Sequence, residues 1–242
     1  MSEHESKSVS RRRLLAASAG VAGMAALAAT RTLAQPSSGA PLKRRRVLVA
    51  LGEFSEGMEA YYMIYRLMEE GVEPVVAAAE VKRLQMVVHD FEPQYSNYTE
   101  KLGYQIETDV AYKDVDPSEF AGLVIPGGRG PEEIRQREDA LEIVRYFLDR
   151  RLPLGAMCHG PQVVYAAGPV KGRRIAAYHG IRADVELAGA TFVDEPVVVD
   201  GALVTSRGWP DLPYFMPKFL EVLGGARGIV RGFDWRPPPG PR

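Results

Sequence analysis

A single cysteine and the histidine beside it are the residues of this chain best suited to covalent chemistry. Cys158 and His159 follow the apolar run 154–157 and precede Gly160 and Pro161, which are typical of a helix start. In an open α/β sheet, functional side chains gather at the carboxyl ends of the strands. A thiol on a sharp strand-to-helix turn is reachable, and the helix N–H groups lower its pKa from about 8.5 to roughly 3.5–7.5. The pattern predicts a nucleophile elbow, with a histidine that exchanges protons with the substrate.

The same cysteine has a simpler interpretation as a small buried hydrophobic residue, the common fate of a lone thiol. Two features favour the nucleophile. Gly160 lets backbone and substrate approach closely, and a second apolar run, residues 122–125, ends at the glycine-rich segment 126–128. Two strand ends of this kind predict one shared site, so we interpret Cys158 as a reactive thiol.

The elements that must position this site alternate between strands and helices. Continuous apolar runs predict buried strands at 46–51, 72–79, 122–125 and 154–157. Helical spacing and helix-end signals predict helices at 58–68, 131–136, 139–150, 160–167, 180–188 and 212–223. Asp200-Gly201 between two apolar runs predicts a hairpin at 197–205. This alternation predicts an α/β fold with a mostly parallel sheet covered on both faces.

Residues 80–104 break the pattern, because aromatic residues are scattered there among acids, proline and asparagine. We predict a long excursion with a short strand at 86–88. Long loops in compact domains are often functional.

Composition narrows the classes of protein that remain. The chain has 242 residues with a net charge of −1, so it has no global field for binding nucleic acid. One cysteine excludes an intrachain disulfide and a multi-thiolate zinc site. The segment 127–130 lacks the spacing of a dinucleotide or phosphate loop, and we expect neither a cofactor nor a metal.

The N-terminus has the features of an export signal. Arg11, Arg12 and Arg13 precede a weakly apolar stretch that is short for a membrane-spanning helix, which needs about 20 apolar residues. Adjacent arginines before such a stretch resemble a bacterial twin-arginine signal. We therefore predict a signal peptide at 1–34, a flexible lead-in at 35–45 and a periplasmic protein that no longer contacts the membrane after cleavage; a frayed helix of the mature fold is the alternative for this segment.

Replacing Arg11 and Arg12 by lysine is expected to abolish export, because twin-arginine signals depend on that pair. Fractionation of cells followed by detection of the chain would measure this. Export of the variant at the wild-type level would contradict a twin-arginine signal.

Two segments carry a resemblance to a known family. Residues 124–132 (VIPGGRGPE) and 156–162 (AMCHGPQ) are similar to the two signature segments of the DJ-1/PfpI family, within the class I glutamine amidotransferase-like superfamily. The similarity extends over most of residues 46–224 and is closest to PfpI-type cysteine peptidases and glyoxalase-like members. It implies a single flavodoxin-like three-layer domain at 46–224, followed by a loose Pro/Arg-rich tail at 225–242.

The resemblance also implies roles for particular residues. Cys158 matches the family nucleophile and His159 its neighbouring histidine. Glu132 matches an acid that reaches the histidine from an adjacent subunit, which implies a homo-oligomer, a dimer or larger. Glu56 and Glu59 match acids that hydrogen-bond the cysteine, and we favour Glu56 slightly.

Further positions follow from the same resemblance. The backbone N–H groups of Gly128 and His159 match an oxyanion hole. Tyr178 and Trp209 are candidate substrate-lining residues. Each assignment has a structural alternative: first-turn acids favoured by the helix dipole for Glu56, Glu59 and Glu132, and a packed turn for Tyr178. Asp211, close to Trp209, is a candidate cap of the last helix.

Three functions fit these residues. The first is a cysteine-dependent enzyme, either a hydrolase of peptides or a glyoxalase or deglycase acting on a small carbonyl compound. The second is a redox or stress sensor that works by oxidation of Cys158. The third is a binding module with an inactive site.

Overall fold

The computed structural model describes residues 45–224, and all of them fall within one compact unit. The predicted export signal at 1–34, almost all of the lead-in at 35–45 and the tail at 225–242 lie outside the described residues. No helix within the described part of the chain is both long and apolar enough to span a bilayer.

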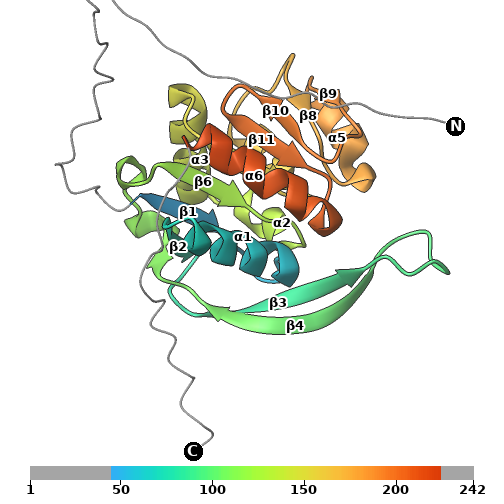
Figure 1. The fold of residues 1–242 in the computed structure, drawn as a ribbon, viewed down its shortest axis with the longest axis horizontal. Coiled ribbons are helices and arrows are strands. Elements are labelled where there is room, and N and C mark those ends of the chain that lie inside the picture. Colours follow the sequence, from blue (N-terminus) through green and yellow to red (C-terminus); the bar gives the residue numbers. More distant parts are fainter. Residues whose placement is uncertain (1–44, 225–242) are drawn as a thin grey trace, which may run out of the picture. The chain divides into compact units, whose positions relative to one another are not determined.

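A mostly parallel sheet forms the centre of the described residues (Figure 1). Its strands run in the order β10-β11-β7-β6-β1-β2-β5, and every neighbouring pair is parallel except β10 and β11. The bounds are β1 (Arg46–Ala50), β2 (Glu73–Ala78), β5 (Val110–Ala111), β6 (Gly122–Ile125), β7 (Leu154–Met157), β10 (Val198–Asp200) and β11 (Leu203–Ser206). The predicted α/β class and the buried strands at 122–125 and 154–157 are confirmed.

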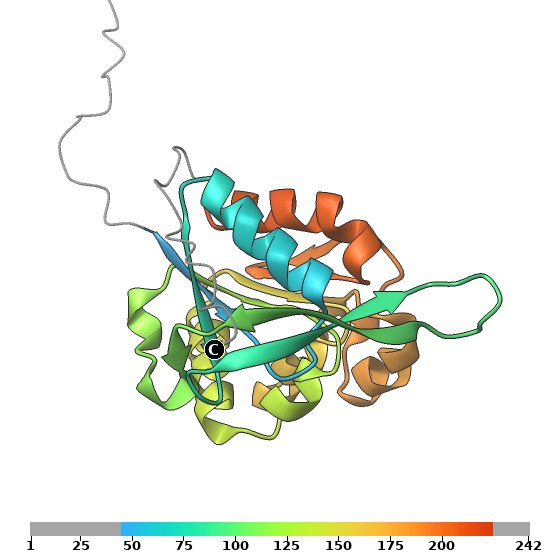
Figure 2. The same cartoon turned by 90° about the horizontal axis from the view of Figure 1, so that it is seen from below.

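Helices cover both faces of this sheet. The bounds are α1 (Gly57–Glu69), α2 (Gly130–Ile134), α3 (Glu138–Arg150), α4 (Pro161–Ala167), α5 (Arg182–Leu187) and α6 (Leu212–Val222). Figure 2 shows α1 and α6 on one side and the other four on the opposite side. Successive β1 residues alternate between two apolar cores: Val47 and Val49 pack with α1 and α6, whereas Leu48 packs with α3 and α4. The sheet therefore holds its strand ends rigidly between two packed layers.

Residues 80–104 differ from the prediction, because most of them belong to a long antiparallel hairpin. Its strands are β3 (Arg83–Asp90) and β4 (Thr99–Glu107), which pair from Arg83 opposite Glu107 to Asp90 opposite Thr99. Figures 1 and 2 show this hairpin extending along one side of the domain to a protruding loop. The predicted strand at 86–88 lies within β3 but is too short. The strand β4 was not predicted, because it is largely exposed on both faces and so has no alternation of apolar and polar residues.

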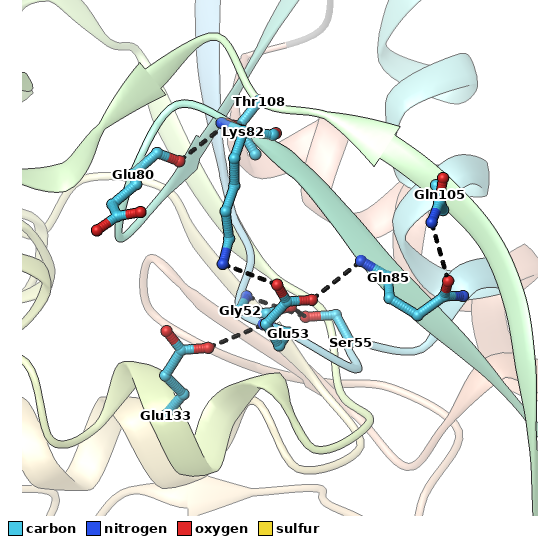
Figure 3. Close-up of polar contacts among 9 residues, drawn as sticks. All are labelled: Gly52, Glu53, Ser55, Glu80, Lys82, Gln85, Gln105, Thr108 and Glu133. Carbon is cyan, nitrogen blue, oxygen red and sulfur yellow. Dashed lines mark hydrogen bonds and ion pairs between the residues drawn. The ribbon is translucent and has the colours of Figure 1, made fainter. Parts of the chain in front are cut away.

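A polar network fixes the base of this hairpin to the loop after β1 (Figure 3). The Glu53 carboxylate forms an ion pair with Lys82 at 2.8 Å and accepts a 3.0 Å hydrogen bond from the N–H of Gln85. The N–H of Glu53 in turn donates to the Glu133 carboxylate of α2 at 2.9 Å. The loop that leads into α1 is therefore held from both the hairpin and α2.

Shorter elements complete the chain. A small parallel pair consists of β8 (Arg174–Ile175) and β9 (Thr191–Phe192), and short 3-10 turns lie at 112–114, 117–119, 179–181 and 209–211. The predicted helix at 180–188 is observed as one of these turns followed by α5.

Candidate active site

Cys158 lies on a strained turn between β7 and α4. Its φ angle is +56°, in the left-handed region that residues other than glycine rarely adopt. Backbone hydrogen bonds of 3.0 Å hold the turn on both sides, from Cys158 N–H to Ser206 and from Tyr178 N–H to the Cys158 carbonyl. The thiol therefore sits at the carboxyl end of the interior strand β7, as the sequence predicts, although only 6% of the residue is exposed.

His159 contacts the thiol directly. Its Nδ1 lies 3.3 Å from Cys158 Sγ, close enough for a hydrogen bond whose direction depends on the tautomer. Burial, followed by the nearby His89 and Arg135, lowers the pKa of His159 to about 4. The imidazole is therefore neutral at pH 7 and able to accept a proton.

Glu59 is the acid that lies beside the thiol. It is fully buried, and its Oε2 accepts a 2.6 Å hydrogen bond from the N–H of Gly127. A Cβ atom placed on Gly127 would lie 2.9 Å from Cys158 Sγ and 3.0 Å from this same Oε2, so both atoms border one small space. Glu59 Oε1 has no hydrogen bond of good geometry among residues 45–224, although the Cys158 thiol is close enough to lower the Glu59 pKa.

Burial raises the pKa of Glu59 well above its ordinary value, and the charge of Glu56 raises it further. A protonated Glu59 carboxyl beside the sulfur is a hydrogen-bond donor to a thiolate. Glu59 and Cys158 titrate as a unit, and once the pair has lost its first proton the two groups share the one that remains.

The preference for Glu56 as the acid that touches sulfur was wrong. Glu56 is the N-cap of α1, and its Oε2 accepts a 2.7 Å hydrogen bond from the N–H of Glu59. The cap turns this side chain back onto the helix, whereas Glu59, one turn further along, points towards Cys158. Burial raises the pKa of Glu56 to about 7.

The expected lowering of the thiol pKa by a helix N-terminus is also not observed. Burial raises the Cys158 pKa well above its ordinary value, and Glu59 raises it further whenever its carboxyl is ionised. The helix contributes little because α4 has only seven residues and begins with Pro161, which lacks an N–H group. Two N–H groups do favour the thiolate, those of Gly128 and His159, which are the pair expected to form an oxyanion hole.

Two glycines give the site its close packing. Gly128 has φ +75°, and a Cβ there would lie 2.3 Å from the backbone nitrogen of Glu56. At Gly160 the helical φ of −51° suits any residue, but a Cβ would lie 2.4 Å from the Ile125 carbonyl oxygen and 2.8 Å from that of Met157. Backbone atoms cannot yield as a flexible side chain can, so β6 and β7 approach the turn at the distance that glycine permits.

Replacing Gly160 by alanine is therefore expected to reduce the free energy of unfolding by about 1–3 kcal/mol, the usual cost of overpacking a rigid site. Urea denaturation would measure this. Gly168→Ala is the matched control, because a Cβ there meets only Leu148 Cδ1 at an ordinary 3.4 Å. Equal stability of the two variants would contradict the steric argument.

The other predicted site residues have different positions. Glu132 is exposed at the start of α2 and forms no hydrogen bond or ion pair with His159 within the described part of one chain. Trp209 supports the hairpin, since its Nε1–H donates a 2.9 Å hydrogen bond to the His89 carbonyl. Asp211 does not cap α6 through its side chain, because its carboxylate accepts hydrogen bonds from both Nε and Nη2 of Arg207.

Tyr178 does line a pocket, together with residues of the hairpin loop that were not singled out from the sequence. The pocket has a volume of about 370 Å³. Its lining consists of Ser96, Asn97, Tyr98, His159, Tyr178, His179 and Gly180. The aromatic residues of segment 80–104 were the only sequence signal for this part of the pocket. Nothing in the sequence indicates that residues 96–98 lie close to the turn that carries Cys158 and His159.

No metal centre is evident in the described chain, because residues 45–224 contain no group of three or more His, Cys, Asp or Glu side chains placed to hold an ion. The chemistry that the arrangement supports is that of a thiol, a neutral imidazole, a buried carboxyl and two N–H donors, positioned at the edge of a pocket of small-molecule size.

Comparison with known proteins identifies the family of this chain. The model of the DJ-1/PfpI family matches residues 45–222. A deglycase of Pyrococcus abyssi is 40% identical over 178 residues, covering 74% of this chain and 99% of the relative. Deglycase PfpI of Pyrococcus furiosus is 38% identical over 177 residues, covering 73% and 98%.

A solved ThiJ/PfpI domain protein of Brachyspira murdochii has the same fold, with a TM-score of 0.65 and 20% identity over 74% of this chain and 96% of that one. The family model spans both strand ends that meet at Cys158, and the relatives match along nearly their whole length. The chain therefore belongs to the DJ-1/PfpI family.

Proposed function

We propose that this protein is a cysteine-dependent enzyme that acts on small carbonyl compounds, in the manner of a deglycase or glyoxalase. The observation that carries the proposal is the shared environment of Cys158 Sγ, which has His159 Nδ1 at 3.3 Å and the carboxyl of Glu59 beside it. Relatives named deglycases support the reaction class. The pocket of about 370 Å³ suits a small molecule better than an extended peptide.

In the proposed first step, the Cys158 thiol adds across the carbonyl. The S–H proton passes to the neutral His159, the S–C bond forms as the carbonyl π bond opens, and the imidazole returns the proton to the new hydroxyl oxygen. The N–H groups of Gly128 and His159, which favour the Cys158 thiolate, would stabilise the developing negative charge. Conversion of a 2-oxoaldehyde to a hydroxy acid then consumes one water molecule and needs no external oxidant.

The full-length protein incubated with methylglyoxal is expected to form lactate, and with the methylglyoxal adduct of an amine it should release the free amine. Chromatography of both products tests the proposal, with an unstructured peptide as the third substrate. The proposal would be overturned if neither carbonyl compound were turned over, whether or not the peptide is hydrolysed.

We propose further that the enzyme works as an exported homo-oligomer in the periplasm. The exposed position of Glu132, which does not reach His159 of its own chain, supports completion of the site by a second copy. Light scattering of the purified protein tests the assembly, and a monomer at micromolar concentration with full activity would contradict it.

A further inference from the structure

Three aromatic rings surround the approach to Cys158. The ring of Tyr98 lies edge-on to His159 at 6.1 Å and to Tyr178 at 5.4 Å, and the Tyr178 ring lies 5.1 Å from His159. All three rings line the pocket, and Tyr98 is only partly buried, so one side of its ring is available to a ligand. Tyr98 comes from the hairpin loop, far in the sequence from the other two.

The hairpin loop is held in this position by its own contacts. The Tyr98 ring is backed by His89, which stacks on it at 4.1 Å. His89 is fixed in turn by Glu100 at 2.9 Å and, through its carbonyl, by Trp209. The Tyr178 hydroxyl donates a 2.7 Å hydrogen bond to Asn97 Oδ1. Tyr98 is therefore preorganised, which lowers the entropic cost of binding against it.

The walls of the pocket have no charged side chain of Asp, Glu, Lys or Arg among the described residues that line it. The low pKa of His159, about 4, leaves that ring neutral as well. The polar groups of the lining include the Ser96 hydroxyl, the Asn97 amide and the His179 ring, but an anionic substrate meets no Lys or Arg side chain there to compensate its desolvation. A flat apolar group instead gains contact with the aromatic rings that line the pocket.

We propose that Tyr98 is a specificity-determining residue and that the site prefers neutral carbonyl compounds bearing a planar, apolar substituent. The assignment rests on the proposed function, because it names the class of carbonyl compound that reaches Cys158. Tyr98 would contact the substituent, while the reacting carbon lies next to the thiol.

Alkylation of Cys158 tests the pocket without requiring turnover. In each reaction the thiolate forms an S–C bond and halide leaves. The reagents are 2-bromoacetophenone, which carries a phenyl ring, iodoacetamide, which is small and neutral, and iodoacetate, which is small and anionic. We compare each rate with that of free cysteine. Wild type is expected to favour the phenyl reagent over iodoacetamide about tenfold, the size of an aromatic contact, and to disfavour the anion. Tyr98→Ala should lose this preference and Tyr98→Phe should keep it.

Tyr95→Ala is the matched control, since Tyr95 is an exposed aromatic residue of the same loop that does not line the pocket. The ratio of phenyl reagent to iodoacetamide should stay at the wild-type value in this variant. Equal ratios in wild type and Tyr98→Ala would overturn the inference, and so would equal losses in the Tyr98 and Tyr95 variants.

Turnover separates this inference from the proposed function. The ratio of kcat/KM for phenylglyoxal to that for methylglyoxal should fall about tenfold in Tyr98→Ala and be restored in Tyr98→Phe. If neither compound is turned over while the alkylation preference holds, the proposed reaction is wrong and the pocket assignment stands. If both are turned over with no dependence on Tyr98, the reaction stands and the specificity assignment is wrong.

Discussion

Cys158→Ser is expected to lower kcat/KM for methylglyoxal by at least about 10³-fold, because a serine hydroxyl is not ionised at neutral pH and has no base strong enough to activate it. The only imidazole in contact with Cys158 is that of His159 within the described residues, and its low pKa of about 4 makes it a weak base for a hydroxyl. Initial rates of lactate formation would measure the loss.

The variant can be checked without ambiguity, because the chain has one cysteine and labelling with iodoacetamide reports on Cys158 alone. Serine differs from cysteine by one atom and keeps the backbone hydrogen bonds to Ser206 and Tyr178, so the melting temperature should stay close to that of wild type. A folded variant that retains a tenth or more of the activity would rule out Cys158 as the nucleophile.

The position of this thiol was predictable because it depends on short-range patterns. A buried parallel strand must be apolar along its length, and the residue that follows lies at the edge of the sheet, so β7 places Cys158 and β6 places Gly128. Glycine is required at these strand ends because neighbouring backbone atoms lie too close for a Cβ, and at Gly128 also because φ is positive. The glycines themselves can be seen in the sequence. The meeting of the two strand ends follows from the α/β topology alone.

The choice between two acids could not be made in this way. Glu56 and Glu59 are three residues apart on one helical turn, and both suit the start of a helix. Which one caps the helix depends on the φ and ψ angles at residue 56, which are set by the loop that Glu53, Lys82 and Glu133 hold in place. That loop is fixed by contacts across long sequence separations, which no local pattern encodes.

The hairpin loop illustrates the same limit. β4 is exposed on both faces, so its residues carry no periodic signal, and Tyr98 reaches His159 only because the loop is held by Trp209 and by the pairing of Tyr178 with Asn97. The sequence indicates an aromatic segment between two elements, but it does not indicate which part of the domain this segment packs against.

Glu59→Gln is expected to raise the pH at which Cys158 becomes reactive by about one unit, which corresponds to about 1.4 kcal/mol. The glutamine carbonyl can still accept from the N–H of Gly127, so the packing is kept. Its amide is a weaker donor to a thiolate than a protonated carboxyl and cannot release a proton. We expect kcat/KM to fall about 10²-fold, the lower end for proton transfer by a positioned group. The pH profile of iodoacetamide labelling measures the shift.

Glu56→Gln is the matched variant, and its shift should have the opposite sign. Glu56 has a pKa of about 7 and gains its charge as the pH rises through that value, and this charge raises the Cys158 pKa. Glutamine keeps an oxygen that can accept from the N–H of Glu59 but carries no charge, so the labelling midpoint should fall. A fall in both variants would mean that Glu59 is ionised in the wild type and holds the thiol in its protonated form. The proton shared by the pair would then reside on sulfur, and attack on the carbonyl would begin with its transfer to Glu59.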